Sequence, residues 1–221
     1  MTINNDNDSR PLVLLVHGLW MSGFELGVLK HRLEAEGRFR TAAFSYPSMT
    51  GSMGDHVKSL IDFAHQQRAS ELHFLGHSLG GLVILKALQI TDDLPPGRAV
   101  LLGTPVQGSL AAQGVARWMP FGKALLGAAV NEEIIECAPR QWSGRREIGV
   151  IAGSMGLGLG LLFADLRADH DGTVMVDETR LPGAKDHVVL ATSHTGMLFS
   201  APVAEQAHHF LLNGVFSKSA E

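Results

Sequence analysis

The chain has 221 residues, 45% of them hydrophobic and 18% charged, a length and composition that fit one globular domain and argue against disorder. Its formal net charge is −4 and its pI is near 6.2, which argues against a general attraction for nucleic acid or anionic membranes. The single cysteine, Cys137, cannot form an intramolecular disulfide, and we interpret it as a packing residue.

The amino-terminal segment MTINNDNDSRP is polar and lacks the basic and apolar regions of a signal peptide. No segment approaches the roughly 18 apolar residues of a membrane span. We therefore expect a cytoplasmic protein without integral membrane association. The expected domain organisation is a flexible tail over residues 1–10, a single domain over residues 11–216 and a second tail over residues 217–221. The oligomeric state is left open.

Apolar runs and helical stripes alternate along the chain. Strands are predicted at Leu12–Val16, Thr41–Pro47, Glu71–Gly76, Ala99–Pro105, Glu147–Gly153 and His187–Thr192. Helices are predicted at Ser22–Glu36, Asp55–Arg68, Leu79–Ile90 and Pro202–Asn213. In the first helix the apolar positions at helical spacing are Phe24, Val28, Leu29 and Leu33. This alternation predicts an α/β fold with a mostly parallel sheet of about six strands and helices on both faces.

Two segments depart from this alternation. Residues 106–143 contain prolines and aromatic residues and predict one or two short helices in an insertion. Within it, Trp118–Val130 is either a small lid over a site or ordinary surface helix. The glycine-rich segment Gly153–Phe163 does not match a nucleotide-binding motif, and is either core packing or a loop that lines an acyl pocket.

The segment FLGHSLGG, Phe74–Gly81, places Ser78 between two glycines at the spacing Gly-x-Ser-x-Gly, directly after a predicted strand. Such a strand–turn–helix can lift a serine out of the sheet as a nucleophile. The alternative is a tight turn whose serine caps a helix. The residues after the other strands favour the nucleophile.

Asp171 follows the fifth predicted strand, and His194 follows the sixth. Because the carboxyl ends of parallel strands share one edge of the sheet, Ser78, Asp171 and His194 are expected there together. Histidine can take the serine proton and the acid can hold the imidazole in the required tautomer. Asp169 is the alternative acid, and the surrounding segment DLRADHDG, residues 165–172, is the alternative metal site.

A tetrahedral oxyanion needs two backbone donors. The candidates are the N–H groups of Leu79, at the start of a helix, and of Leu19, in the loop after the first strand. His17 is expected to hold that loop by hydrogen bonds, and His77 to shape the turn at Ser78.

The set VHGLW, GHSLGG, LGTPVQGS, DGTV and SHTGML resembles the α/β-hydrolase superfamily, in particular small lipase- and esterase-like members related to the lipase-like GPI-inositol deacylase group. The resemblance spans residues 11–216. It implies a minimal form of the hydrolase fold without the first two antiparallel strands, with Ser78 as nucleophile, Asp171 as acid, His194 as base, and Leu19 and Leu79 as oxyanion donors. Val106 stands where such lipases often carry histidine.

The sequence thus predicts hydrolysis of a carboxylic ester through an acyl-enzyme on Ser78, without a metal or cofactor. Trp20, Met21 and Trp118 are expected to bind a small hydrophobic acyl-ester substrate. Acyl transfer, thioester cleavage and amide cleavage use the same residues and remain alternatives. So does a non-catalytic ligand-binding protein on the same fold, or an interaction role for residues 106–143.

Overall fold

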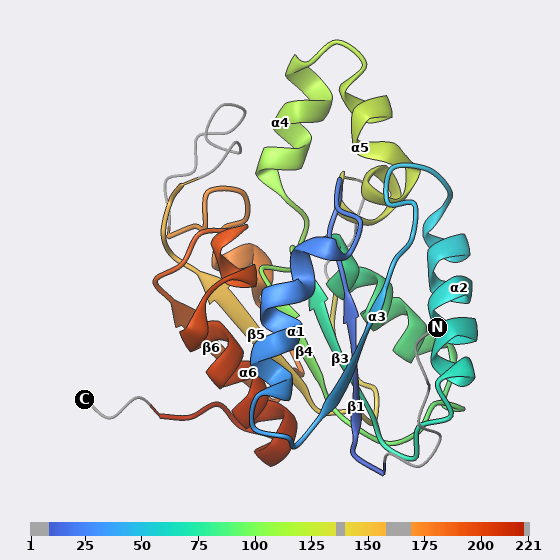
Figure 1. Ribbon diagram of the computed structural model, residues 1–221. Helices are drawn as coiled ribbons and strands as arrows, with labels where there is room; N and C mark the ends of the chain where they lie inside the picture. Colours follow the sequence, from blue (N-terminus) through green and yellow to red (C-terminus); the bar gives the residue numbers. More distant parts are fainter. Residues whose placement is uncertain (1–8, 136–139, 158–168, 219–221) are drawn as a thin grey trace.

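The computed structural model describes residues 9–135, 140–157 and 169–218. Its six strands form one parallel sheet in the order β2-β1-β3-β4-β5-β6 (Figure 1). The strands are β1 (Leu12–Val16), β2 (Arg40–Phe44), β3 (Leu72–His77), β4 (Ala99–Leu102), β5 (Ile148–Gly153) and β6 (Asp186–Leu190). All-parallel pairing aligns the carboxyl ends of the strands along one edge, as the sequence predicted.

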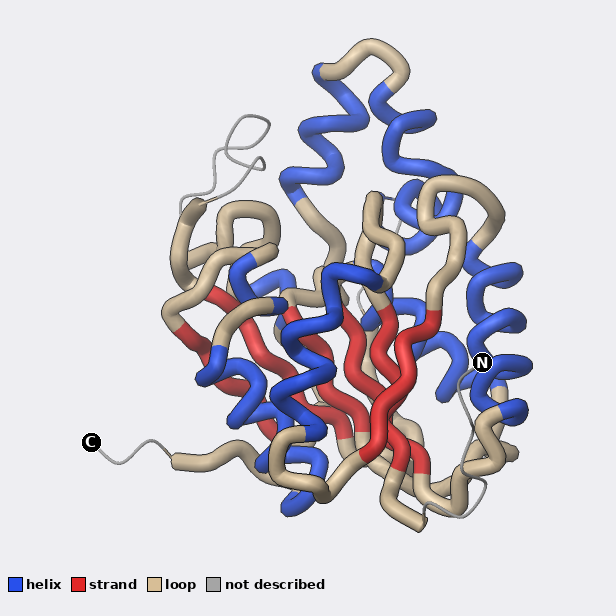
Figure 2. Tube along the Cα trace, viewed as in Figure 1, coloured by secondary structure: helices blue, strands red, loops and turns tan. Residues whose placement is uncertain are grey.

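Helices cover both faces of the sheet (Figure 2). Strand residues alternate between two cores: Leu14 and Phe74 belong to one, and Leu15 and Leu75 to the other. The first core is closed by α2 (Met53–Gln66) and α3 (Leu79–Ile90), the second by α1 (Gly27–Glu34) and α6 (Ala201–Asn213). Burial of the central strands on both faces explains their near-continuous apolar sequence.

The predicted start of the first helix, at Ser22, is wrong. Instead of a helix from Ser22, a short 3-10 helix, η1 (Phe24–Leu26), precedes α1. Phe24 is 91% exposed and Val28 is 39% exposed, whereas Leu26 is fully buried. The change of helix type shifts the angular position of each side chain, so the inward stripe begins at Leu26 and not at Phe24.

The insertion forms a helical hairpin that projects beyond the carboxyl edge of the sheet (Figure 1). It consists of α4 (Leu110–Trp118) and α5 (Gly122–Val130), and a π-helical turn, η2 (Asn131–Ile135), follows. At its base Glu133 contacts both Lys86 of α3 and Arg140, and the Arg140 Nη2 to Glu133 Oε2 distance is 2.6 Å. The buried Glu133 and its two partly exposed cationic partners attach the base of the hairpin to α3.

Some expectations fall outside the described residues: the packing role of Cys137, most of the glycine-rich Gly153–Phe163 segment, and parts of both terminal tails. Among the residues that are described, no helix is long and apolar enough to cross a membrane.

Candidate active site

Ser78 lies at the turn between β3 and α3. Its backbone has φ 53° and ψ −121°, a region that non-glycine residues rarely adopt and that costs about 1–3 kcal/mol. The Ser78 N–H donates to the Leu102 carbonyl of β4 at 2.9 Å, and the Ser78 carbonyl accepts from the Gly81 N–H. The hydroxyl caps no helical N–H. The capping alternative therefore fails, and the turn has the strained strand-to-helix geometry of a nucleophile elbow.

Glycines make this turn possible because the backbone passes very close to its neighbours. A Cβ atom on Gly80 would lie 2.3 Å from the Val16 carbonyl oxygen and 2.5 Å from that of His17. A Cβ atom on Gly76 would lie 2.7 Å from the backbone of Gly81. The glycines around Ser78 are thus required by close contact between β3, α3 and the end of β1.

Replacement of Gly80 by alanine is expected to lower the free energy of unfolding by about 3 kcal/mol or more, since the added methyl group collides with two backbone carbonyls. Gly54→Ala is the matched control, because Gly54 lies in the first turn of α2, where a Cβ would meet only Ser52 Oγ at 3.6 Å. Urea denaturation of both variants measures the difference. A Gly80 variant as stable as the Gly54 variant would contradict the contact.

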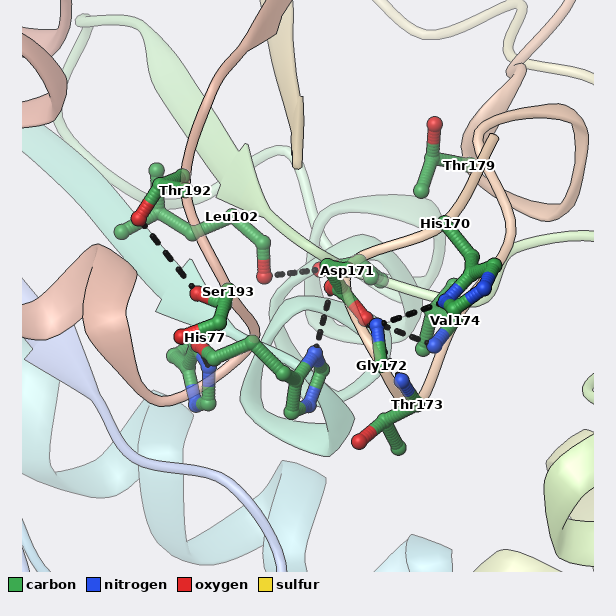
Figure 3. A network of polar contacts seen from close by, with 12 residues as sticks. His77, Leu102, His170, Asp171, Gly172, Thr173, Val174, Thr179, Thr192 and Ser193 are labelled. Carbon is green, nitrogen blue, oxygen red and sulfur yellow. Dashed lines mark hydrogen bonds and ion pairs between the residues drawn. The ribbon is translucent and has the colours of Figure 1, made fainter. Parts of the chain in front are cut away.

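Asp171 and His194 meet at the same edge of the sheet. Asp171 Oδ2 lies 2.7 Å from His194 Nδ1, and the other carboxylate oxygen accepts hydrogen bonds from the N–H groups of Thr173 (2.9 Å) and Val174 (2.7 Å). Figure 3 shows the tight turn over Gly172 that wraps around the carboxylate. The backbone N–H of His194 also donates to the backbone carbonyl of Asp171 at 2.8 Å.

This environment keeps Asp171 ionised although its side chain is 1% exposed. Burial alone raises the pKa of the carboxyl, but attraction to His194 and the hydrogen bonds from His194, Val174 and Thr173 outweigh it, so the pKa lies below its ordinary value. The alternative acid, Asp169, is exposed and has its backbone carbonyl bonded to the Val176 N–H. The geometry thus favours Asp171 over Asp169 as partner of His194.

The end of β4 lies between this pair and the elbow, because the Leu102 carbonyl accepts from the Ser78 N–H and Gly103 follows Leu102. A Cβ on Gly103, just past β4, would lie 3.0 Å from Asp171 Oδ2 and 3.1 Å from His194 Nδ1. On the other side, a Cβ on Gly18 would lie 3.1 Å from Ser78 Cβ. Within the described part of the chain the Ser78 hydroxyl has no hydrogen-bond partner, and serine–histidine contacts often tighten only when substrate is bound.

His77 connects the elbow to the histidine loop. Its Nε2 lies 2.9 Å from the His194 carbonyl oxygen, and the two imidazole rings are 4.7 Å apart. Because a carbonyl only accepts, Nε2 carries the proton. Burial and the neighbouring His194 lower the pKa of His77 to about 3, so this imidazole is neutral in the folded protein. His77 therefore holds the elbow and the His194 loop together, consistent with the structural role predicted for it.

The free energy of unfolding is expected to fall as the pH drops below about 6.5, because the unfolded chain then binds a proton at His77 that the folded chain, with a pKa of about 3, does not bind. The stability that the neutral His77 contributes is fully present only well above pH 6.5. Between pH 6.5 and the folded pKa of about 3, it falls by up to about 1.4 kcal/mol per pH unit. His77→Gln keeps a side-chain donor and should have a shallower slope. Urea unfolding at several pH values tests this, and identical slopes would contradict it.

His17 and Tyr46 hold the loop after β1 by hydrogen bonds. His17 Nε2 accepts from the Tyr46 N–H at 3.2 Å, its Nδ1 lies 2.8 Å from the Gly18 carbonyl oxygen, and the Tyr46 hydroxyl donates to the His17 carbonyl at 3.0 Å. The Trp20 N–H donates to Ser48 Oγ at 3.2 Å. These bonds fix the backbone on both sides of Leu19, whereas Leu79 opens α3 directly after Ser78.

The structure separates the three residues expected to bind substrate. Trp20 is 49% exposed, and its indole N–H donates to the Leu125 carbonyl of α5 at 3.1 Å. Met21 packs against the core under α1 and α6. Trp118 ends α4 at the outer end of the hairpin and is 71% exposed. Only Trp20 and Met21 thus lie in the loop that carries Leu19.

Sequence reasoning missed Glu178. This side chain is buried, and its two oxygens accept from the Leu110 N–H (2.6 Å) and the Met175 N–H (2.8 Å). Burial raises its pKa, and these hydrogen bonds partly oppose the rise. Glu178 thus joins the segment after Asp171 to the start of α4. No sequence motif surrounds Glu178, so the sequence did not indicate that it bridges these two segments.

In the described residues, no group of metal-ligating side chains and no lining of the cavity at β3, β4 and β5 includes the candidate site. In residues 9–135, 140–157 and 169–218 no three His, Cys, Asp or Glu side chains are grouped to hold a metal ion. Part of the alternative metal segment, residues 165–168, is not described. A cavity of about 480 Å³ lies near the amino ends of β3, β4 and β5, where its lining residues Arg98 and Glu147 pair at 2.7 Å. It is therefore at the edge opposite Ser78.

A parallel sheet with a strained serine after a central strand, and an acid–histidine pair at the same edge, is typical of enzymes with a serine nucleophile. The chain belongs to the alpha/beta hydrolase family, whose sequence profile matches residues 13–176. No curated protein shows significant sequence similarity to it.

Solved structures share the fold at low identity. Lipase BlEst2 of Bacillus licheniformis, in its mature form, has 19% identity and a TM-score of 0.72 over 90% of each chain. A metagenomic carboxyl esterase has 17% identity and a TM-score of 0.61 over 85% of this chain and 65% of its own. The RedJ thioesterase of Streptomyces coelicolor has 12% identity and a TM-score of 0.59 over 91% of this chain and 89% of its own.

Proposed function

We propose that the protein hydrolyses carboxylic esters through a covalent acyl-enzyme on Ser78. The observation that carries this proposal is the strained Ser78 elbow at the same sheet edge as the Asp171–His194 pair, whose Oδ2 and Nδ1 atoms are 2.7 Å apart. Ser78 Oγ attacks the ester carbonyl while His194 takes its proton. Asp171 holds His194 in the tautomer with a free Nε2 and stabilises the imidazolium.

In the same proposal the N–H groups of Leu19 and Leu79 stabilise the oxyanion. His194 then protonates the leaving alcohol, and it activates water for deacylation. Trp20 and Met21 line the acyl side, and the α4–α5 hairpin is a lid over it, with Trp118 at its exposed outer end. No metal or cofactor takes part in these steps.

Thioester cleavage, amide cleavage and acyl transfer pass through the same tetrahedral intermediate and are the alternative reactions. Kinship with the lipase-like GPI-inositol deacylase group and a cytoplasmic location stay predictions. Hydrolysis rates of an ester, a thioester and an amide that share the same acyl chain distinguish these reactions. We expect the highest kcat/KM on the ester.

A fluorophosphonate probe tests the proposal directly, because it reacts with a serine only when a base and an oxyanion hole activate it. We expect one covalent adduct by intact mass on the native chain, and none on Ser78→Ala. A folded native chain that forms no adduct would favour a non-catalytic ligand-binding protein. An adduct that persists on Ser78→Ala would place the nucleophile elsewhere.

A further inference from the structure

The outer end of the α4–α5 hairpin presents two large aromatic side chains to solvent. Its sequence is RWMPFGK, residues 117–123, in which Trp118 is 71% exposed and Phe121 is 88% exposed. The hairpin projects from the same sheet edge that carries Ser78 (Figure 1). Exposed aromatic residues at the end of a projecting element indicate a contact with something outside the chain.

The backbone holds these side chains outward. Phe121 has φ 58° and ψ 22°, a left-handed conformation that is costly for a bulky residue. The turn is tight, because the Gly122 N–H donates to the Met119 carbonyl at 3.0 Å, and a Cβ on Gly122 would lie 2.1 Å from the Val115 carbonyl oxygen. The tip is thus a tight turn that exposes Phe121, which is not packed into either core of the described residues.

The charge of the hairpin differs from that of the whole chain. Between Leu110 and Val130 the only charged residues are Arg117 and Lys123, which flank the two aromatic residues, whereas the chain as a whole has a net charge of −4. The Arg117 guanidinium lies over the Trp118 ring, 5.2 Å from its centroid. The next acidic residues along the chain are Glu132 and Glu133, and the Asn131 side chain just before them donates to the Lys123 carbonyl at 2.8 Å. Glu132 accepts from the Met53 N–H, and Glu133 pairs with Lys86 and Arg140.

Size and chemistry together select the partner. A stable protein–protein interface buries about 800 Å² on each side and needs a broad surface, which a tip with two aromatic side chains does not offer. Tryptophan and other large apolar side chains insert at the boundary between lipid headgroups and acyl chains. Lysine and arginine beside them attract anionic headgroups.

We propose that the tip of the α4–α5 hairpin docks the protein on an anionic lipid surface, with Trp118 and Phe121 inserted among the acyl chains and Arg117 and Lys123 at the headgroups. The net charge of −4 argues against a general attraction to anionic membranes, and this hairpin supplies a local one. The binding is peripheral, and it can be tested without the proposed catalysis.

Co-sedimentation with vesicles tests the docking. The full chain carries Ser78→Ala, so that hydrolysis cannot alter the lipid and the result does not depend on the proposed activity. Vesicles contain phosphatidylcholine alone or with phosphatidylglycerol. We expect binding to the anionic vesicles, and at least about tenfold weaker binding for Trp118→Ala/Phe121→Ala.

Each of Arg117→Gln and Lys123→Gln is expected to weaken binding by about fivefold, and added salt should act in the same direction. Ile90→Ala is the matched control, since Ile90 is 63% exposed but ends α3 away from the hairpin, and its binding should be unchanged. Circular dichroism verifies that each variant is folded.

Three results would overturn the proposal: no sedimentation of the parent chain with anionic vesicles, equal binding to the neutral vesicles, or unchanged binding of the aromatic double variant. Self-association without lipid that the double variant abolishes would also overturn it, because a second copy of the chain would then occupy the tip.

Discussion

Replacing Ser78 by alanine is expected to lower kcat for an ester substrate by about 10⁴- to 10⁶-fold, with KM nearly unchanged. The substitution removes the only atom that can form the acyl-enzyme in the proposed reaction. The Asp171–His194 pair does not involve the Ser78 hydroxyl, and so it should persist. Steady-state kinetics with a chromogenic ester measure the loss.

Two further variants make this prediction specific. His194→Ala should lose about as much activity as Ser78→Ala, and the double variant should lose no more than either, because the two groups act as one unit. Losses that multiply in the double variant would mean that Ser78 and His194 act independently. If Ser78→Ala keeps activity within tenfold of the native value, an acyl-enzyme on Ser78 is ruled out. A tenfold loss corresponds to only about 1.4 kcal/mol of transition-state stabilisation.

Asp171→Asn is expected to lower kcat by about 10⁴-fold while the fold is retained. The N–H groups of Thr173 and Val174 bind one carboxylate oxygen at 2.9 Å and 2.7 Å, so they should select the amide oxygen at that position. The amide nitrogen must then face His194 Nδ1. A donor at that position forces the imidazole proton onto Nε2, the atom that has to accept the proton of Ser78.

Asp169→Asn is the matched control, because it makes the same chemical change two residues away at an exposed side chain. We expect it to leave kcat unchanged. A pH profile adds a second measurement: activity of the Asp171 variant should rise at alkaline pH if the tautomer is the defect. Equal losses in the two variants would mean that the segment, and not the Asp171 carboxylate, supports catalysis.

The sequence predicted the layer architecture because the strands are buried on both faces. A strand such as Leu12–Val16 has no polar position, and its pattern cannot be confused with a surface helix. Bounds were less predictable where a local turn changes the helix type. At Phe24 the 3-10 turn starts after Gly23, whose φ is 95°, and this conformation has no signature in apolar spacing. The predicted strand that ends at Pro47 was also too long, because β2 ends at Phe44.

Within the candidate site, short-range motifs were predictable and long-range bonds were not. The elbow at Ser78 is encoded by glycines within three residues of it. The bond between His77 Nε2 and the His194 carbonyl joins residues 117 positions apart, and no pattern within one segment can reveal it. Glu178 is a similar case, because its partner Leu110 lies 68 positions away. The surroundings of Trp20 and Trp118 were equally unpredictable, because they depend on the direction in which the α4–α5 hairpin projects.

The indole bond from Trp20 to the Leu125 carbonyl joins α5 to the residue next to Leu19. Trp20 itself has φ 60°, so its backbone holds a strained conformation that this bond and the Ser48 bond maintain. Movement of α5 therefore changes the forces on the Leu19 N–H. In the proposed reaction the Leu19 N–H binds the oxyanion, so by thermodynamic linkage a ligand that shifts the hairpin would alter the affinity for that oxyanion, and the oxyanion would alter the affinity for the ligand by the same factor.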